Sequence, residues 1–297
     1  MCRRMALSTK APPSILPAAT TIGTAILRVA EADRSLRWYV DMMGLQLLDR
    51  STERLVLGAG GTPVLNLEVR PGAAPRDENT TGLHHVAILV PERPSLAGVL
   101  TRIAKAGVRL GASDHLVSEA LYIWDHDNNG LEIYRDRPRE EWSWDGKFIR
   151  MATEPLDLRN LAAEVLGTGK ENEPMPVGTR TGHVHLQVGD LGVAKQFYCD
   201  VLGFEQTAGR GGALFVSAGG YHHHVGLNTW HSLNGPPPAE GAAGLVVFEI
   251  MVPDRSALAD LKGRVQAAGH AVTDRNDGIL LRDPWGTSIR VLAAPQA

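Results

Sequence analysis

Hydrophobic and polar residues follow one pattern four times along the chain. Each repeat opens with the alternating apolar and polar positions typical of a half-buried strand. These openings are IGTAILRV from Ile22, GLHHVAILV from Gly82, TGHVHLQV from Thr181 and GLVVFEIMV from Gly244. An amphipathic segment follows in each repeat and stops at a glycine, namely Gly44, Gly107, Gly203 and Gly269. Because glycine tolerates the left-handed backbone that ends many helices, these segments are predicted to be helices.

Three further strand-like runs complete each repeat. In two repeats the last pair of runs is joined by a turn rich in Asp and Gly, DHDNNG from Asp125 and DPWG from Asp283. The repeating unit is therefore βαβββ, and the sequence predicts an α+β fold of four such modules.

The repeats also set the expected domain boundaries. A connection rich in Gly, Pro and Glu, with the helix-like LDLRNLAAEVLG, separates the second and third modules and is typical of a linker. The opening MCRRMALSTKAPPSILPAATT lacks a long apolar run before a small-residue cleavage site, so we expect a flexible arm and no secretion signal. The expected parts are an arm at 1–20, a half at 21–137 (modules 22–70 and 82–137), a linker with a helix at 138–180, and a half at 181–296 (modules 181–230 and 243–296).

Composition narrows the class of partner. The formal net charge is -3 and the basic residues are scattered, which argues against nucleic acid. No apolar run approaches the ~20 residues of a membrane span. The two cysteines, Cys2 and Cys199, are too few for a disulfide scaffold and favour a cytoplasmic location. We expect a small-molecule partner, and a homo-oligomer is left open because a second subunit often covers exposed sheet edges.

Strand alternation places several chemically capable side chains on one face. In TGHVHLQV the apolar valines and leucine leave His183 and His185 on the opposite face, and in GLHHVAILV the same test selects His85. In NGLEIYRD, Glu132 and Tyr134 lie opposite the apolar positions. We therefore expect two imidazoles and a carboxylate to face a common cleft.

This donor set is typical of non-haem Fe(II), because two neutral imidazoles and one carboxylate leave positions open for substrate and O2. His85, Glu132 and His183 are the predicted metal ligands. The equivalent positions of the first and fourth modules are Thr24, Val247 and Arg290. That pair of modules is expected to be vestigial or structural.

These motifs resemble the vicinal-oxygen-chelate superfamily and, within it, the extradiol catechol 2,3-dioxygenases. The resemblance extends from Ile22 to Pro295 and is sharpest in SDHLVSEALYIWDHDNNGLEIY and SAGGYHHHVGLNTW. It implies two half-barrel domains built from the four modules. It also implies an iron enzyme of aromatic catabolism that opens a catechol-type diol with O2 to a semialdehyde. Fe(II) is the expected metal, with Mn(II) left open because nitrogen and oxygen donors discriminate weakly.

The resemblance also implies residue roles. His183, His85 and Glu132 match the family's metal ligands. His224 matches the acid–base histidine, with His223 as a one-residue alternative. The residues expected nearer the substrate are Tyr122, which would orient the substrate by a hydrogen bond to its oxygen, His115 in an active-site loop, and His222 and His185 in the pocket wall.

The proposed ligand set depends on how the modules pair. In better known extradiol enzymes all ligands come from the two C-terminal modules, whereas here they come from the second and third. Face-to-face pairing of these two modules would bring His183 to His85 and Glu132, and pairing of adjacent modules would separate them. Two other functions remain open: a glyoxalase-like isomerase or epimerase, which would need a second carboxylate, and a metal-free protein that binds an aromatic drug, which the histidine-rich face disfavours.

Overall fold

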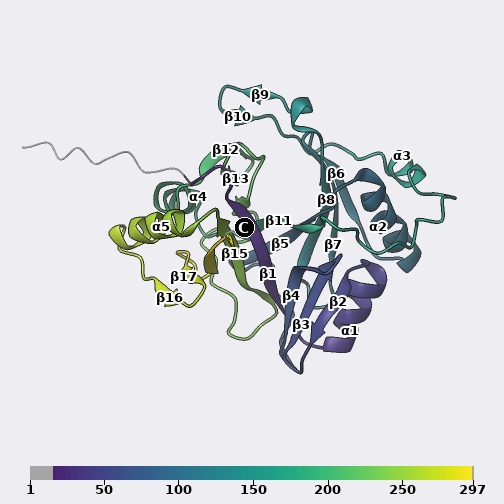
Figure 1. The fold of residues 1–297 in the computed structure, drawn as a ribbon, viewed down its shortest axis with the longest axis horizontal. Coiled ribbons are helices and arrows are strands. Elements are labelled where there is room, and N and C mark those ends of the chain that lie inside the picture. The colour runs from purple at the N-terminus through teal and green to yellow at the C-terminus, as the bar shows by residue number, and fades with distance from the viewer. Residues whose placement is uncertain (1–15, 296–297) are drawn as a thin grey trace, which may run out of the picture.

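The computed structural model describes residues 16–295 of the chain (Figure 1). Residues 1–15 of the expected arm lie outside this range. From residue 16 onward the chain is packed against the fold, since Leu16 is buried and its amide donates to the carbonyl of Gly203 at 2.9 Å.

Two eight-stranded sheets make up the framework. Sheet A contains, in spatial order, β16 (Thr273–Arg275), β17 (Gly278–Arg282), β18 (Ser288–Ala293), β15 (Gly244–Val252), β1 (Thr21–Val29), β4 (Thr62–Val69), β3 (Arg54–Ala59) and β2 (Gln46–Arg50). Sheet B contains β12 (Glu205–Arg210), β13 (Ala213–Ser217), β14 (Val225–Asn228), β11 (Arg180–Gln187), β5 (Gly82–Leu89), β8 (Gly130–Asp136), β7 (Ser118–Trp124) and β6 (Gly111–Asp114). Sheet A joins the first and fourth modules, and sheet B joins the second and third. This is the pairing that the predicted ligand set requires.

Each module carries its helix where the sequence predicts it. The helices are α1 (Ala32–Leu36), which continues as the π-helix η1 (Arg37–Met42), α2 (Arg93–Ala106), α4 (Leu191–Lys195), which continues as the π-helix η3 (Gln196–Val201), and α5 (Arg255–Ala267). The four glycines that follow have φ between 66° and 93°, so the predicted left-handed stops are present. In Figure 1, α1 and α2 lie on one side of the molecule and α4 and α5 on the other, so each sheet spans both halves of the chain.

The linker has structure of its own. It contains η2 (Arg139–Glu141), the short strands β9 (Trp144–Asp145) and β10 (Phe148–Ile149), and α3 (Leu158–Ala163). The carboxylate of Asp157 accepts hydrogen bonds from two backbone amides and caps α3, the helix expected in this region. Glu154 forms a β-bridge with Asp114, which fixes the linker against the second module.

The apolar faces of both sheets join one continuous core. Val86, Ile88, Val184 and Leu186 are fully buried, as the alternation predicts for β5 and β11. Burial of each such side chain contributes about 1.5–3 kcal/mol, which fixes the register because a one-residue slip would expose all four. No helix among residues 16–295 is both long and apolar enough to cross a membrane.

Candidate metal centre and active site

Three neighbouring strands of sheet B carry the predicted ligands. β5 runs antiparallel to β11 and parallel to β8, and Ala87 on β5 is level with His183 on one side and Glu132 on the other. His85 precedes Ala87 by two residues on the same face. Ala87 is fully buried in a small apolar cluster with Leu89, Ala120 and Tyr134, and its methyl group is much smaller than the three ligand side chains.

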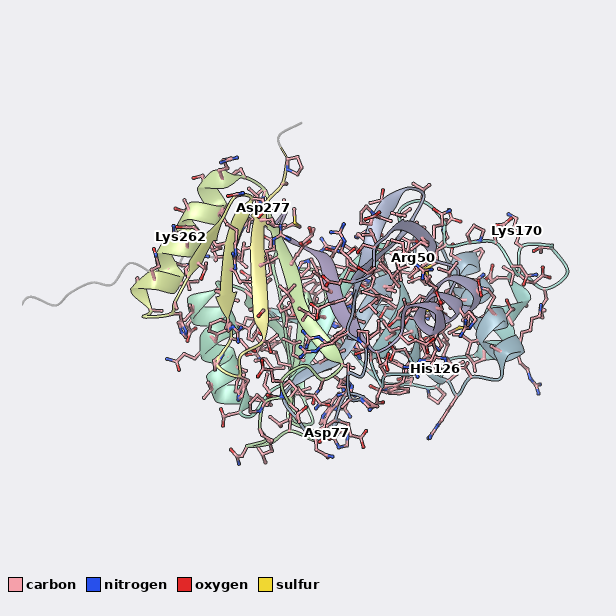
Figure 2. The ribbon with its side chains drawn as sticks, turned by 90° about the horizontal axis from the view of Figure 1, so that it is seen from below. Arg50, Asp77, His126, Lys170, Lys262 and Asp277 are labelled. Carbon is pink, nitrogen blue, oxygen red and sulfur yellow. The ribbon has the colours of Figure 1, made fainter. Side chains whose placement is uncertain are left out.

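The three side chains converge on a point. Oε2 of Glu132 lies 2.9 Å from Nε2 of His85 and 3.1 Å from Nε2 of His183, and the three ligand atoms lie within 4.8 Å of one another. All three residues are buried, with exposures of 6%, 2% and 1% for His85, Glu132 and His183. The charged side chains of Asp77 and Lys170, labelled in Figure 2, in contrast lie at the outer edge of the molecule in that view. A buried carboxylate needs a cationic partner, and a divalent metal is one.

The donor atoms fit a metal ion. Nε2 of His85 has no hydrogen-bond partner despite its closeness to Glu132, so the approach lacks hydrogen-bond geometry. Burial lowers the pKa of His183 to about 4, which keeps its imidazole neutral. Nε2 of His183 donates to Glu132 and Nδ1 has no hydrogen-bond partner, so metal binding at Nε2 requires the tautomer with the hydrogen on Nδ1. Burial alone would raise the pKa of Glu132, but the two imidazoles hold it well below its usual range. The group thus offers two neutral nitrogens and one carboxylate.

The equivalent place in sheet A holds an ion pair. Glu249 on β15 is level with Arg290 on β18, and Nη1 of Arg290 lies 3.1 Å from Oε1 of Glu249. Oε2 of Glu249 also accepts a hydrogen bond from the hydroxyl of Thr24 at 2.7 Å. Among the described residues, His85, Glu132 and His183 form the group suited to a metal, and sheet A contributes none.

Tyr122 and His115 flank the carboxylate. Tyr122 on β7 is directly opposite Glu132 on β8. Its hydroxyl donates to Nε2 of His115 at 2.6 Å, because Nδ1 of that ring donates to the carbonyl of Ala152 at 2.7 Å and a carbonyl can only accept. Burial and the nearby Glu132 raise the pKa of Tyr122 well above its usual range, so the hydroxyl keeps its proton. Both predicted residues therefore reach the site.

The run of three histidines is not part of a regular strand. In a strand, alternation would put His222 and His224 on one face and His223 on the other, but β14 begins only at Val225. Gly219 and Gly220 have φ of 63° and 64°, and this left-handed turn leads into an irregular segment where alternation does not apply.

His223, not His224, reaches the metal ligands. The ring centroid of His223 lies 4.0 Å from that of His183. Nδ1 of His224 accepts from the amide of Ala218 at 3.1 Å, and its ring packs against Tyr221. This geometry favours His223, the one-residue alternative, over His224 for the proposed acid–base role.

His185 lies in the wall of the site, as expected. Its ring centroid is 4.9 Å from that of His85 and 5.4 Å from that of Trp230. Gly226 lies level with it on β14, and a Cβ there would lie 2.8 Å from the His185 ring. Nε2 of His185 is buried and has no hydrogen-bond partner. This wall therefore presents an unused polar atom beside the predicted metal ligands.

Sequence reasoning missed some residues around the site. Asp136 accepts a hydrogen bond from Nε2 of His222 at 2.9 Å, and the Trp142 ring packs against His222. Asp136 follows Glu132 and Tyr134 at the two-residue spacing of β8, so strand alternation could have found it. Trp142 and Ala152 belong to the linker, where no periodic pattern indicates a contact.

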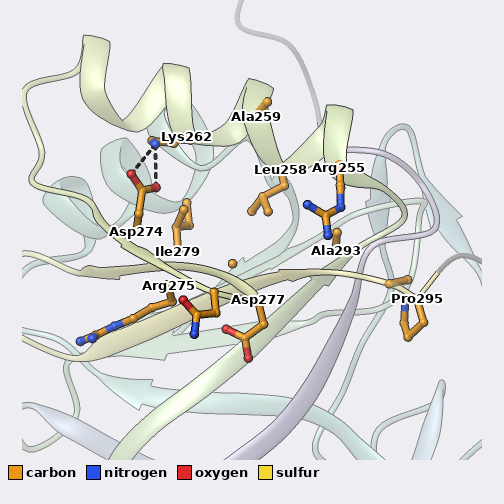
Figure 3. Close-up of a pocket in the computed structure, with 13 residues that line it drawn as sticks. Arg255, Leu258, Ala259, Lys262, Asp274, Arg275, Asp277, Ile279, Ala293 and Pro295 are labelled. Carbon is orange, nitrogen blue, oxygen red and sulfur yellow. Dashed lines mark hydrogen bonds and ion pairs between the residues drawn. The ribbon is translucent and has the colours of Figure 1, made fainter.

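A separate hollow of about 620 Å³ lies between α5 and the strands β16 to β18 (Figure 3). Lys262 and Asp274 in its wall form an ion pair. None of the predicted site residues lines this hollow. It is therefore not part of the candidate active site.

Comparisons with known proteins agree with this architecture. A family model described as the Glyoxalase/Bleomycin resistance protein/Dioxygenase superfamily matches residues 21–133 and 180–291. A relative from Bacillus subtilis (strain 168), named catechol-2,3-dioxygenase, is 41% identical over 271 residues, which are 89% of this chain and 94% of that protein.

Solved structures share the fold at low identity. A candidate dioxygenase from Bacillus subtilis is 16% identical, with a TM-score of 0.66 over 96% of this chain and 87% of that one. Glyoxalase I from Zea mays is 18% identical, with a TM-score of 0.56 over 93% of this chain and 92% of that one. At these identities the likeness concerns the fold alone.

Proposed function

Because the chain belongs to the Glyoxalase/Bleomycin resistance protein/Dioxygenase superfamily, we propose that it is an extradiol dioxygenase. It would use O2 to open a catechol-type aromatic diol to a semialdehyde. The observation that carries the proposal is the convergence of His85, Glu132 and His183 within 4.8 Å. The name of the Bacillus subtilis relative supports the same reaction.

Fe(II) is the proposed metal, because the reaction with O2 needs a redox-active ion and zinc is not one. When bound, the iron would bring the diol and O2 together and would lower the pKa of the diol hydroxyls. His85, Glu132 and His183 would hold it, and their single negative charge leaves a net positive centre for an anionic diol.

The remaining side chains would handle the substrate. Nε2 of His223 would accept a proton from a diol hydroxyl and later return it to the ring-opened product, since the ring lies against His183. The Tyr122 hydroxyl, whose hydrogen goes to His115, would accept a hydrogen bond from a hydroxyl of the diol.

An oxygen electrode and a visible spectrum test the proposal together. Iron-loaded protein should consume one O2 per catechol and produce a yellow ring-opened product. A glyoxalase-like isomerase would bind metal but consume no O2, and it would normally need a second carboxylate, which the His85–Glu132–His183 group lacks. A binding protein would retain the aromatic compound unchanged. Either of these outcomes would contradict the proposal.

A further inference from the structure

A chain of hydrogen bonds leads from a carboxylate to His223. Nε2 of His222 lies 2.9 Å from Oδ1 of Asp136, and Nδ1 of His222 lies 2.8 Å from Nδ1 of His223. His222 is 1% exposed, whereas the side chain of Asp136 is 25% exposed. These hydrogen bonds thus connect the C-terminal end of β8 with the ring that packs on His183.

The direction of each bond follows from the carboxylate. A carboxylate can only accept, so Nε2 of His222 carries the hydrogen. In a neutral ring the other nitrogen is then bare, and Nδ1 of His222 accepts from Nδ1 of His223. The same rule leaves Nε2 of His223 bare. No side chain among residues 16–295 hydrogen-bonds this Nε2, so its lone pair is free for a substrate hydroxyl.

Neighbouring aromatic side chains hold Asp136 and His222 in this hydrogen-bonded arrangement. The hydroxyl of Tyr221 donates to Oδ2 of Asp136 at 2.9 Å, and Tyr134 donates to Tyr221 at 2.8 Å. The rings of Tyr134, Trp142 and Tyr221 surround His222 at centroid distances of 4.1 to 5.9 Å. Without the carboxylate, either histidine could be the donor in the hydrogen bond between the two rings, because two neutral imidazoles alone do not fix its direction.

From this geometry we infer that Asp136, acting through His222, is a positioning residue that fixes the tautomer of His223 and presents its bare Nε2 to the substrate. The inference rests on the proposed role of His223 in ring cleavage. Neither Asp136 nor His222 needs to touch the substrate. In sheet A the position equivalent to Asp136, four residues after Arg290, is Ala294, so the arrangement belongs to sheet B.

Asp136→Asn tests the inference in the full-length iron-loaded enzyme. The amide can donate to His222 and reverse both hydrogen bonds, which would place a hydrogen on Nε2 of His223. We expect kcat to fall by roughly 10²-fold or more, since an orienting carboxylate can be worth up to about 10⁴-fold in kcat. Iron content and the KM for catechol should stay near wild-type values. A kcat within about threefold of wild type would overturn the inference, since an effect that small is under 1 kcal/mol.

Three further variants separate the possible failures. His222→Phe should lower kcat as much as Asp136→Asn, and the double variant should be no worse than either single one. Tyr221→Phe keeps both imidazole bonds and should have a much smaller effect. If His223→Ala itself retains full kcat, the proposed role of His223 fails. If His223→Ala is inactive while Asp136→Asn and His222→Phe are fully active, the positioning role alone fails.

A spectroscopic readout needs no variant. Ring ¹⁵N chemical shifts of His223 in the full chain loaded with diamagnetic zinc distinguish a bare from a protonated Nε2. We expect a bare Nε2 in the wild-type protein and a protonated one in Asp136→Asn. A hydrogen on Nε2 in the wild-type protein would contradict the inference even if a variant fails to fold.

Discussion

Nε2 of His183 and Oε2 of Glu132 lie 3.1 Å apart although 51 residues separate them in the chain. The contact exists because β11 and β8 are both neighbours of β5, each level with Ala87. Pairing of the second and third modules therefore builds the site, and pairing of adjacent modules would have divided it.

Removal of a ligand should abolish metal binding and turnover together. Glu132→Ala and His85→Ala each leave two donors, which is too few to hold a divalent ion in a buried site. Metal analysis of the purified variants should find iron near background, with O2 consumption equally low. Thr24→Ala, at the position of sheet A that corresponds to His183, should retain the metal. Sustained turnover in either ligand variant would remove the assignment.

Ala87→Leu should prevent metal binding although all three ligand residues are kept. The larger side chain would extend between His183 and Glu132, and both residues level with it are buried and cannot move aside cheaply. We expect loss of most bound iron, measured by elemental analysis, while circular dichroism shows a folded protein. Full iron content in Ala87→Leu would mean that the ion binds elsewhere.

Much of this site could be predicted from the sequence. Alternation on regular strands correctly placed His85, Glu132 and His183, because the side-chain period of a strand is fixed by its backbone. His223 could not be distinguished from His224 in the same way, since Gly219 and Gly220 turn the chain before β14 begins. The hydrogen bond from His115 to the carbonyl of Ala152 could not be predicted either, because Ala152 lies in a loop whose path is set by tertiary contacts and not by a local sequence period.

His223→Ala should mainly lower kcat, whereas His224→Ala should mainly lower the stability of the protein. His223→Ala should keep its iron and lose roughly 10²–10⁴-fold in kcat, the usual value of a general acid–base group. His224→Ala leaves the buried amide of Ala218 unpaired and should cost about 1–3 kcal/mol of stability with a smaller effect on kcat. Steady-state kinetics and urea unfolding measure the two effects. The reverse pattern would restore His224 as the acid–base residue.

Gly226→Ala should disturb the wall of the site. The added Cβ would lie 2.8 Å from the His185 ring and push it toward His85. We expect a loss of about 1–3 kcal/mol in the free energy of unfolding, typical of overpacking. Gly263→Ala is the matched control, because a Cβ in α5 at that position meets nothing within 4 Å. It should instead stabilise the protein by about 0.5–1 kcal/mol. Equal effects would contradict the packing argument.

Cys199 should react slowly with thiol reagents. Burial raises the pKa of its thiol to about 11, so the reactive thiolate is scarce at pH 8 and increases as the pH rises toward 11. In a Cys2→Ser background, we expect native protein at pH 8 to react roughly 100-fold more slowly than unfolded protein, whose thiol has a pKa of about 8.5. The rate is measured with a disulfide reagent that releases a coloured thiolate when it reacts with a cysteine, by following the absorbance of that product. Equal rates in the native and unfolded protein would contradict the expected burial.

Anomalous X-ray diffraction at the iron edge, on crystals grown without O2, tests the metal centre most directly. We predict a single iron peak per chain, about 2.0–2.2 Å from Nε2 of His85, Nε2 of His183 and a carboxylate oxygen of Glu132, as for nitrogen and oxygen donors of first-row metals. An active, iron-containing protein whose peak lies away from these three atoms would contradict the proposed centre.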